Sequence, residues 1–326
     1  MKQFRKCWLA LGAIALAGFG TLLQASSEAA AQAYPNRNVT IVVPFGAGSI
    51  TDSLARVLGD KLGTMWKQTI VVENKPGLPG TTAAAKAAPD GYTLILTSNG
   101  HTIARAINKD VPFDPVKDFA GVTVIASVPL VAIVPADFPA KTLKEFIVLA
   151  KASPGKFNFS SAGVASTSFL STEIFRQLAG LNMLHVPYKG VPDMITAVIR
   201  ADAQLNFAPI PNAKELSSAG KVRAIAINSD KRAPQLPDVP TVAEELPGYK
   251  YESWFGLMAP AGTPREILLK VSQDVAKVLE MPDVREKLTA FGSFPAPTTP
   301  AQFDAIIKAD TERYAKVLKD AGIGTN

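Results

Sequence analysis

A glycine-containing segment, Pro44 to Asp52, joins an apolar run to a helix-period run. Glycine lets the backbone turn sharply and approach a ligand, while a helix start presents unpaired amides and the positive end of its dipole. Such a site holds anions well. The candidate ligand-binding residues here are Phe45, Gly46, Ala47, Gly48, Ser49, Thr51 and Asp52. The segment lacks the ending of a phosphate-binding P-loop and the glycine spacing of the dinucleotide fingerprint, which disfavours nucleotides.

The same segment has a second interpretation that needs no ligand. It is then a tight turn in which Ser49, Thr51 or Asp52 caps the following helix and Asp52 pairs with Arg56, four residues on. The pattern alone does not choose between the two interpretations.

A second loop of similar composition runs from Ser160 to Ser168, again between a strand and a helix. Its candidate binding residues are Ser161, Gly163, Ala165, Ser166, Thr167 and Ser168. Capping by Ser166 or Thr167 would produce the same sequence, and capping is compatible with binding because several amides are free at a helix start. We hypothesise that the two helix starts face each other and share one carboxylate.

Smaller candidates follow other strands, where α/β sheets present loops to a crevice. They are Ser98, Asn99, Tyr188, Ala208 and Pro209. The only two histidines, His101 and His185, are too few for a metal cluster, so we expect no metal and no cofactor. The motifs of hydrolases and metalloproteases are absent, and we expect no catalytic activity.

Strand-like and helix-like segments alternate, which is typical of α/β architecture. The first series comprises strands 39–43, 70–72 and 92–97 with helices 51–62 and 81–88; the second comprises strands 131–134, 156–160 and 222–228 with helices 143–150 and 166–178. The tail adds an apolar strand, 254–259, and two amphipathic helices. We expect this tail to return to the first lobe, which requires two crossovers.

The amino terminus has the order of a secretory signal peptide. Lys2, Arg5 and Lys6 precede an apolar run that is shorter than the roughly 20 residues of a membrane span, and cleavage is expected near Ala33. The single cysteine, Cys7, lies within this segment, so the mature chain would form no disulfide. The formal net charge of +6 falls to +4 without residues 1–33, and this mild basic excess suits an anionic ligand. The scattered basic residues do not resemble a nucleic-acid patch.

Several segments, in order along the chain, resemble one family. They are Tyr34-Pro35, Val43-Pro44-Phe45-x-Ala47-Gly48, Val72 to Gly77, Ala88 to Leu94, Phe113 to Phe119, His185 to Gly190, Pro237 to Val242, and Trp254 to Pro264. The sequence is similar to tripartite tricarboxylate transporter receptors of the TctC type, also called Bug proteins.

The resemblance implies a type II periplasmic-binding-protein fold, with two α/β lobes, a ligand cleft between them and two crossovers. The expected divisions are a signal peptide at 1–33, a first lobe at 34–128 plus 252–326, and a second lobe at 129–251. It further implies a periplasmic protein of a Gram-negative bacterium, expected to be a monomer, that delivers a small carboxylate to membrane permease subunits and binds no nucleic acid. A sensor for a signalling partner, or an enzyme on the same fold, are the alternatives.

Departures from the family pattern bear on specificity. Phe169 stands where the family usually has His, and Phe207-Ala208-Pro209 replaces a common Phe-Asp-Asn. Without that Asp, an amino-acid ammonium group has no partner. We therefore expect a carboxylate with an apolar or aromatic body rather than citrate or an amino acid.

Overall fold

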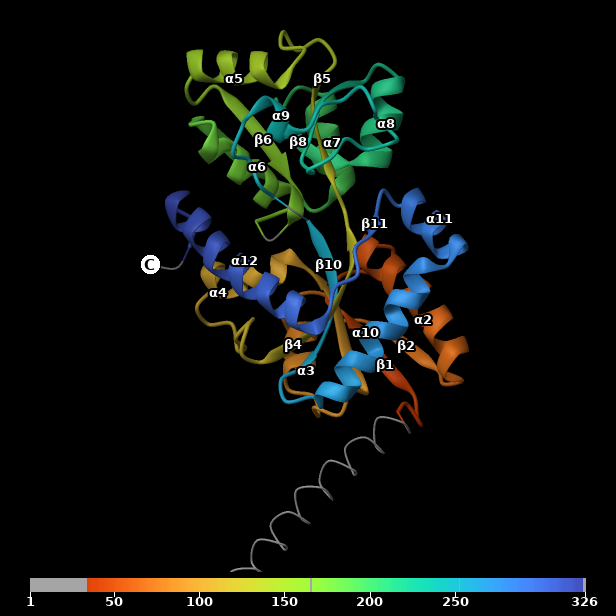
Figure 1. The fold of residues 1–326 in the computed structure, drawn as a ribbon. Helices are drawn as coiled ribbons and strands as arrows, with labels where there is room; N and C mark the ends of the chain where they lie inside the picture. Colours follow the sequence, from red (N-terminus) through yellow and green to blue (C-terminus); the bar gives the residue numbers. More distant parts are fainter. Residues whose placement is uncertain (1–33, 165, 252, 325–326) are drawn as a thin grey trace, which may run out of the picture.

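The computed structural model describes residues 34–164, 166–251 and 253–324; the expected signal peptide lies outside them. The described chain forms two α/β lobes, one above the other, joined by two crossing segments (Figure 1). We call the lobe with the six-stranded sheet the first lobe and the other the second lobe. Within the described ranges, no helix combines the length and apolarity needed to cross a membrane.

The first lobe has a sheet of strand order β11-β4-β10-β3-β1-β2. The strands are β1 (Val39–Val43), β2 (Ile70–Asn74), β3 (Thr93–Ser98), β4 (Phe119–Ser127), β10 (Trp254–Pro260) and β11 (Phe294–Pro295). Strands β1, β2 and β3 are parallel, whereas β10 runs antiparallel to β3 and β4. The surrounding helices are α2 (Ile50–Trp66), α3 (Leu78–Ala85), the 3-10 helix η1 (Asn99–Ile103), α4 (Ala104–Ile107), α10 (Arg265–Glu280), α11 (Pro282–Ala290) and α12 (Pro300–Asp320).

The second lobe has strand order β7-β6-β8-β5-β9, in which an isolated bridge between Phe159 and Leu205 links β6 to β8. Its strands are β5 (Leu130–Pro135), β6 (Phe157–Ser161), β7 (Met183–Pro187), β8 (Asn206–Pro209) and β9 (Val222–Ile227). Its helices are α5 (Leu143–Ala152), α6 (Thr167–Leu178), α7 (Val191–Ile199), α8 (Ile210–Ser218) and α9 (Val242–Glu245). The predicted α/β alternation is therefore present in both lobes.

The two crossing segments run side by side. Strand β4 leads directly into β5, and the return passes through Tyr251 and Ser253 into β10. Val128 N donates to Ser253 O at 3.0 Å, which ties one crossing to the other. In the sheet register Phe255 lies opposite Ser98, so the carboxyl end of β3 lies at the crossing edge. The loops that follow the parallel strands β1, β2 and β3 therefore face the second lobe.

The strands of the second lobe are oriented so that the carboxyl ends of β6 and β8 point toward the first lobe. Leu130, the first residue of β5, lies opposite Pro209, the last residue of β8. Strand β6 runs parallel to the start of β8 at the isolated bridge between Phe159 and Leu205, where Ser160 N donates to Leu205 O at 3.0 Å. The loop after β6 thus leaves the edge of its sheet that faces the first lobe.

The last helix, α12, contacts both lobes. Phe303 and Ile307 pack into an apolar cluster of the first lobe, whereas Tyr314 and Leu318 pack into one dominated by second-lobe residues. Gln177 Nε2 in α6 also donates to Val317 O, at 2.6 Å. The tail therefore covers the first lobe as expected, but the end of α12 extends beyond it onto the second.

Candidate functional site

The loop before α2 is held by Asp52. Its carboxylate accepts hydrogen bonds from the amide of Gly48 at 2.9 Å and from Asn74 Nδ2 at 2.9 Å, and it forms an ion pair with Arg56 at 3.0 Å. Burial alone would raise the pKa of Asp52, but the bonds from Arg56, Gly48 and Asn74 outweigh it and lower the pKa. Asp52 therefore stays ionised and shapes the loop, as in the capping interpretation.

The tip of this loop is open to solvent. Gly46, Ala47 and Gly48 are exposed, and Gly48 has a φ of 80°, which favours glycine. Ser49 is the N-cap of α2, since its Oγ accepts from Asp52 N at 3.2 Å. Among the described residues, no hydrogen bond engages the amides of Ala47, Ile50 or Thr51. These amides and the dipole of α2 leave this loop able to hold an anion.

The loop before α6 is held by hydroxyl groups instead. Ser166 is the N-cap: its Oγ accepts from Phe169 N at 3.2 Å and donates to Gly163 O at 2.6 Å. The Oγ of Ser168, a buried residue, accepts from Ala162 N at 3.2 Å. In the described part of the chain the amides of Thr167 and Ser168 have no hydrogen-bond partner. This helix start can therefore also hold an anion. Ala165 lies outside the described residues.

Ser161, at the end of β6, shares a 2.6 Å hydrogen bond with His185 Nε2 of β7. The imidazole packs between Phe159 and Phe169, with ring centroids 4.8 and 4.7 Å away. Burial lowers the pKa of His185 to about 4, so the ring is neutral near pH 7. Phe169, at which this sequence departs from the family pattern, therefore packs against His185 beneath the loop before α6.

A hydrogen-bonded chain joins the two lobes at Tyr251, which lies in the second crossing. Tyr251 OH accepts from Asn99 Nδ2 of the first lobe at 3.0 Å and donates to Thr167 O, at the start of α6, at 3.0 Å. Asn99 is fully buried, and its Oδ1 has no partner among the described atoms. Two of the predicted residues, Asn99 and Thr167, are therefore linked through a residue that the sequence did not single out.

An apolar cavity of about 360 Å³ lies on the first lobe beside Phe45. The residues lining it come from the loops after β1 and β2, from β3, α3, η1 and α4, and from the segment after α4: Pro44, Phe45, Gly77, Leu78, Thr81, Thr97, Gly100, His101, Ala104, Ile107, Asn108, Val111 and Phe113. Burial lowers the pKa of His101 to about 4, and its Nε2 bonds Pro115 O at 3.0 Å. The cavity is thus a largely uncharged surface next to the anion-holding loop.

The remaining predicted residues have structural contacts. Ser98 is buried at the end of β3. The amide of Tyr188 donates to Ser161 O at 2.8 Å, and its ring packs on an apolar cluster of the second lobe. Ala208 belongs to that same cluster, and Pro209 pairs with Leu130 in the sheet. The described residues contain no group of three or more possible metal ligands.

Asn74, His185 and Tyr251 contribute to the two loops but were not predicted to do so. Asn74 accepts from Arg56 at 3.1 Å and donates to Phe45 O at 3.2 Å, so it anchors the first loop from β2. Its signals in the sequence are its position near a strand end and its place in the family-like segment Val72 to Gly77. Tyr251 sits in an irregular segment, where pattern analysis has no periodicity to use.

Residues 54–323 match the model of the tripartite tricarboxylate transporter family receptor. Three solved structures are similar over nearly the whole chain. The periplasmic binding protein BugD is 32% identical with a TM-score of 0.75, covering 90% of this chain and 100% of its own. Rpa4515 of R. palustris, solved with adipate, is 35% identical with a TM-score of 0.77 and coverages of 89% and 99%. MatC of Rhodopseudomonas palustris, with bound malate, is 33% identical with a TM-score of 0.73 and coverages of 87% and 100%. These matches confirm the resemblance and the fold expected from the sequence.

Proposed function

The chain belongs to the tripartite tricarboxylate transporter receptor family, and from this premise we propose that it captures a small organic carboxylate between its lobes and delivers it to a membrane permease. Members of this family are periplasmic solute-binding receptors and not enzymes. The ligand class is supported by the adipate and malate of the two R. palustris structures. Export with cleavage near Ala33 forms part of the same proposal.

One observation carries the proposal. The helices α2 and α6 each begin with unengaged amides, and the loops that lead to them leave sheet edges that face each other across the crossings. In the first lobe these are the amides of Ala47, Ile50 and Thr51, and in the second those of Thr167 and Ser168. An anion between them would gain contacts from both lobes that it cannot make when the lobes are apart. Such differential binding favours the closed state, and no chemical step is required.

The first-lobe cavity supports an apolar ligand body. Its walls include Phe45, Leu78 and Ile107, whereas its polar side chains are the uncharged Thr81, Thr97, His101 and Asn108. A carboxylate held at the start of α2 could extend its hydrocarbon part into this space. A polycarboxylate such as citrate would have to bury further charges there without partners.

Titration calorimetry with adipate, benzoate, citrate and aspartate tests the proposal. We expect benzoate to bind most tightly, adipate to bind more weakly because its second carboxylate has no charged partner in the cavity, and citrate and aspartate to bind far more weakly still. Ala47→Asp should abolish binding because a carboxylate at the exposed loop tip repels the anion, whereas the isosteric, neutral Ala47→Asn should retain it. Binding of citrate or aspartate alone would overturn the specificity, and equal binding by the Asp and Asn variants would overturn the site.

A second matched pair tests the cavity. Leu78 and Leu184 are both exposed leucines, but only Leu78 lines the cavity. Leu78→Ser should weaken binding of the preferred acid several-fold, because about 0.8 kcal/mol is lost per methylene that the ligand no longer buries. Leu184→Ser should leave the affinity unchanged. Equal effects of the two substitutions would argue against an apolar subsite at this position.

A further inference from the structure

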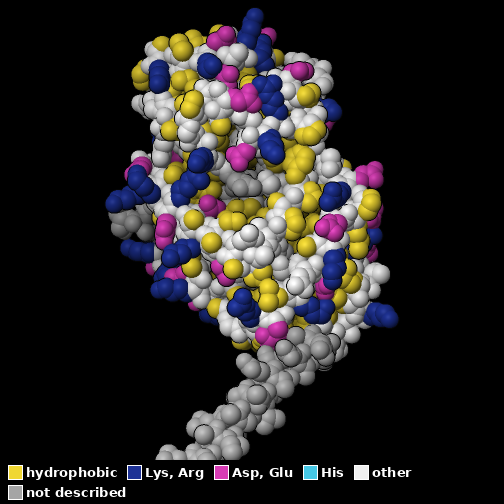
Figure 2. Space-filling view, viewed as in Figure 1, with side chains coloured by type: hydrophobic (Ala, Val, Ile, Leu, Met, Phe, Trp, Pro, Cys, Tyr) yellow, Lys and Arg dark blue, Asp and Glu magenta, His cyan; other side chains and the backbone are white. Residues whose placement is uncertain are grey.

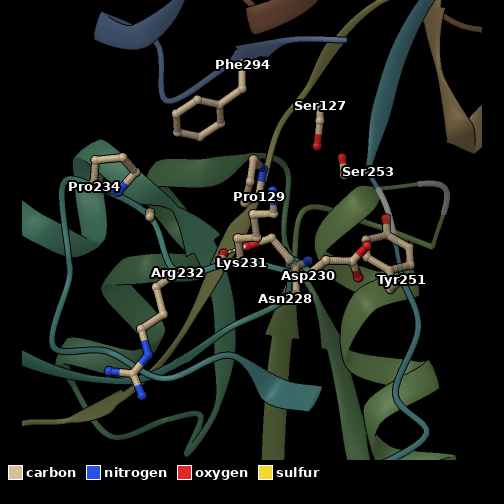
Figure 3. A pocket seen from close by; sticks show the side chains of 12 residues that line it. Ser127, Pro129, Asn228, Asp230, Lys231, Arg232, Pro234, Tyr251, Ser253 and Phe294 are labelled. Carbon is tan, nitrogen blue, oxygen red and sulfur yellow. Dashed lines mark hydrogen bonds between the residues drawn. The ribbon is translucent and has the colours of Figure 1, made fainter. Parts of the chain in front are cut away.

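A second cavity, of about 380 Å³, lies at the waist between the lobes, where both crossings contribute to its wall. In Figure 3, Phe294, Ser127 and Ser253 of the first lobe lie on one side, and the segment 228–234 of the second lobe lies on the other. Figure 2 shows the molecule narrowed and hollowed at this level. The volume falls within the range of small-molecule sites.

This waist cavity lies on the opposite side of the crossings from the two anion-holding loops. In the first lobe it borders β11 and β4, whereas the loops after β3 and β1 lie beyond β10. In the second lobe it borders the end of β9, whereas the loop after β6 lies beyond β5 and β8. The two sites therefore share the crossings as a common wall and can be occupied separately.

The waist cavity contains an unused buried hydroxyl group. Ser253 is 2% exposed, and its Oγ has no hydrogen-bond partner among the described atoms. Asn228, which also lines the cavity, is already engaged: its Oδ1 accepts from Leu130 N at 2.6 Å and its Nδ2 donates to Ser171 Oγ at 2.9 Å. A buried polar group without a partner is costly. A ligand hydroxyl that reached Ser253 would remove this cost.

The charges around the cavity do not favour an ion. Arg232 is neutralised by a two-pronged contact with Glu244. Asp230 and Lys231 are both exposed, carry opposite charges and make no ion pair within the described chain. The apolar walls include Pro129, Pro234 and Phe294. We propose that the waist cavity is a binding site for a small uncharged aromatic molecule with one hydroxyl group, which would bond Ser253 and pack on Phe294.

Occupancy of this site is coupled to lobe closure, because its walls come from both lobes. The lobes also touch nearby: a Cβ on Gly292 of the first lobe would lie 2.7 Å from Pro211 Cδ of the second. When the lobes open on the side of the anion-holding loops, rotation about the crossings narrows the waist cavity. A molecule bound there opposes that rotation and favours closure.

Phenol, titrated by protein-observed NMR into the ligand-free mature protein, tests the site without any carboxylate. We expect millimolar binding, with the largest shifts at residues 127–129, 228–234, 251, 253 and 294. Ser253→Ala should weaken phenol binding about fivefold, the size of one hydrogen bond, and Ser127→Leu should abolish it by filling the cavity. The matched control, Ser293→Ala, should leave phenol binding unchanged. Ser293 is also a buried hydroxyl without a described partner, but it does not line the cavity.

Lobe closure is read from fluorescence energy transfer between dyes at Pro76→Cys and Lys189→Cys, on loops after β2 and β7. Cys7, the only natural cysteine, lies in the expected signal peptide, so the labels are unique in the mature chain. Phenol should raise the transfer efficiency in the wild-type background and not in Ser127→Leu. Absence of shifts at the waist, or shifts that Ser127→Leu leaves unchanged, would overturn the site. Binding without increased transfer would overturn the coupling. Neither result depends on whether a carboxylate binds between the loops.

Discussion

The two anion-holding loops have the same place in their lobes but are held by different chemistry. The loop before α2 depends on a buried charge, Asp52, with Arg56 and Asn74 around it. The loop before α6 depends on neutral groups, namely the hydroxyls of Ser161, Ser166 and Ser168 and the imidazole of His185. A helix start can thus be kept open for a ligand either by one ion or by several neutral hydrogen bonds. The two designs should respond differently to mutation and pH.

Removal of Asp52 should have the largest effect. Asp52→Ala leaves Arg56, the Gly48 amide and Asn74 without their shared acceptor. Because breaking a buried ion pair costs about 3–5 kcal/mol and Arg56 is half-exposed, we expect a loss near the lower end, about 3 kcal/mol. Urea denaturation measures it. The control is Asp60→Ala in the same helix, at an exposed position, where the change should stay within about 0.5 kcal/mol. Similar losses in both variants would contradict a special role for Asp52.

The pH dependence should separate the two loops. Burial lowers the pKa of His185 to about 4 in the folded protein, against 6.5 as its ordinary value. The unfolded chain therefore binds more protons between these pH values, and stability should fall as pH falls from 6.5 to 4. The free energy of unfolding should fall by at most about 1.4 kcal/mol per pH unit. Water near the partly exposed ring makes the fall smaller than this limit.

His185→Gln should flatten this part of the stability curve but not remove it, because His101 has a pKa lowered in the same direction. Asp52 acts in a lower window: its pKa is below the usual 3.8, so its contribution is lost only on further acidification. Chemical denaturation at several pH values from 7 to 3 measures both. An unchanged slope between pH 6.5 and 4 in His185→Gln would show that the imidazole does not support the second loop.

Tyr251 supports only one of the two loops, because its described hydrogen bonds tie it to the loop before α6 and not to the loop before α2. Tyr251→Phe removes the bonds to Asn99 and Thr167 while keeping the ring. It also leaves the buried Asn99 Nδ2 without a partner, so we expect a loss of about 2 kcal/mol. Tyr92→Phe, which removes a more exposed hydroxyl bonded to Asn36, should cost less than about 1 kcal/mol. Equal costs would show that the link between the lobes has no special strength.

The sequence predicted the regular parts of this molecule better than the irregular ones. The strands β1 and β3 and the helices α2 and α6 follow from apolar periodicity and capping residues, which are local properties. The sequence could not assign Asp52, since a carboxylate four residues before Arg56 suits both a cap and a ligand site. The structure places it in the loop's own hydrogen bonds.

The waist cavity and the reach of α12 were not predictable in this way. The residues around the waist cavity, which include Ser127, Pro129, the segment 228–234, Tyr251 and Ser253, are distant in sequence and meet only because the crossings lie side by side. The apolar face of α12 predicts that the helix packs, but not against which surface. Tyr314 and Leu318 find theirs in the second lobe's cluster, a choice made by tertiary structure alone.

The smallest expected difference lies between the two N-caps. Ser49→Ala removes one acceptor, for Asp52 N, so it should cost about 1 kcal/mol. Ser166→Ala removes the acceptor for Phe169 N and also the bond to Gly163 O, so it should cost a few tenths of a kcal/mol more. Thermal unfolding of the two variants side by side resolves this difference. If Ser49→Ala were the costlier, the first loop would depend on its cap as well as on Asp52. The contrast between a loop held by one ion and a loop held by many neutral bonds would then not hold.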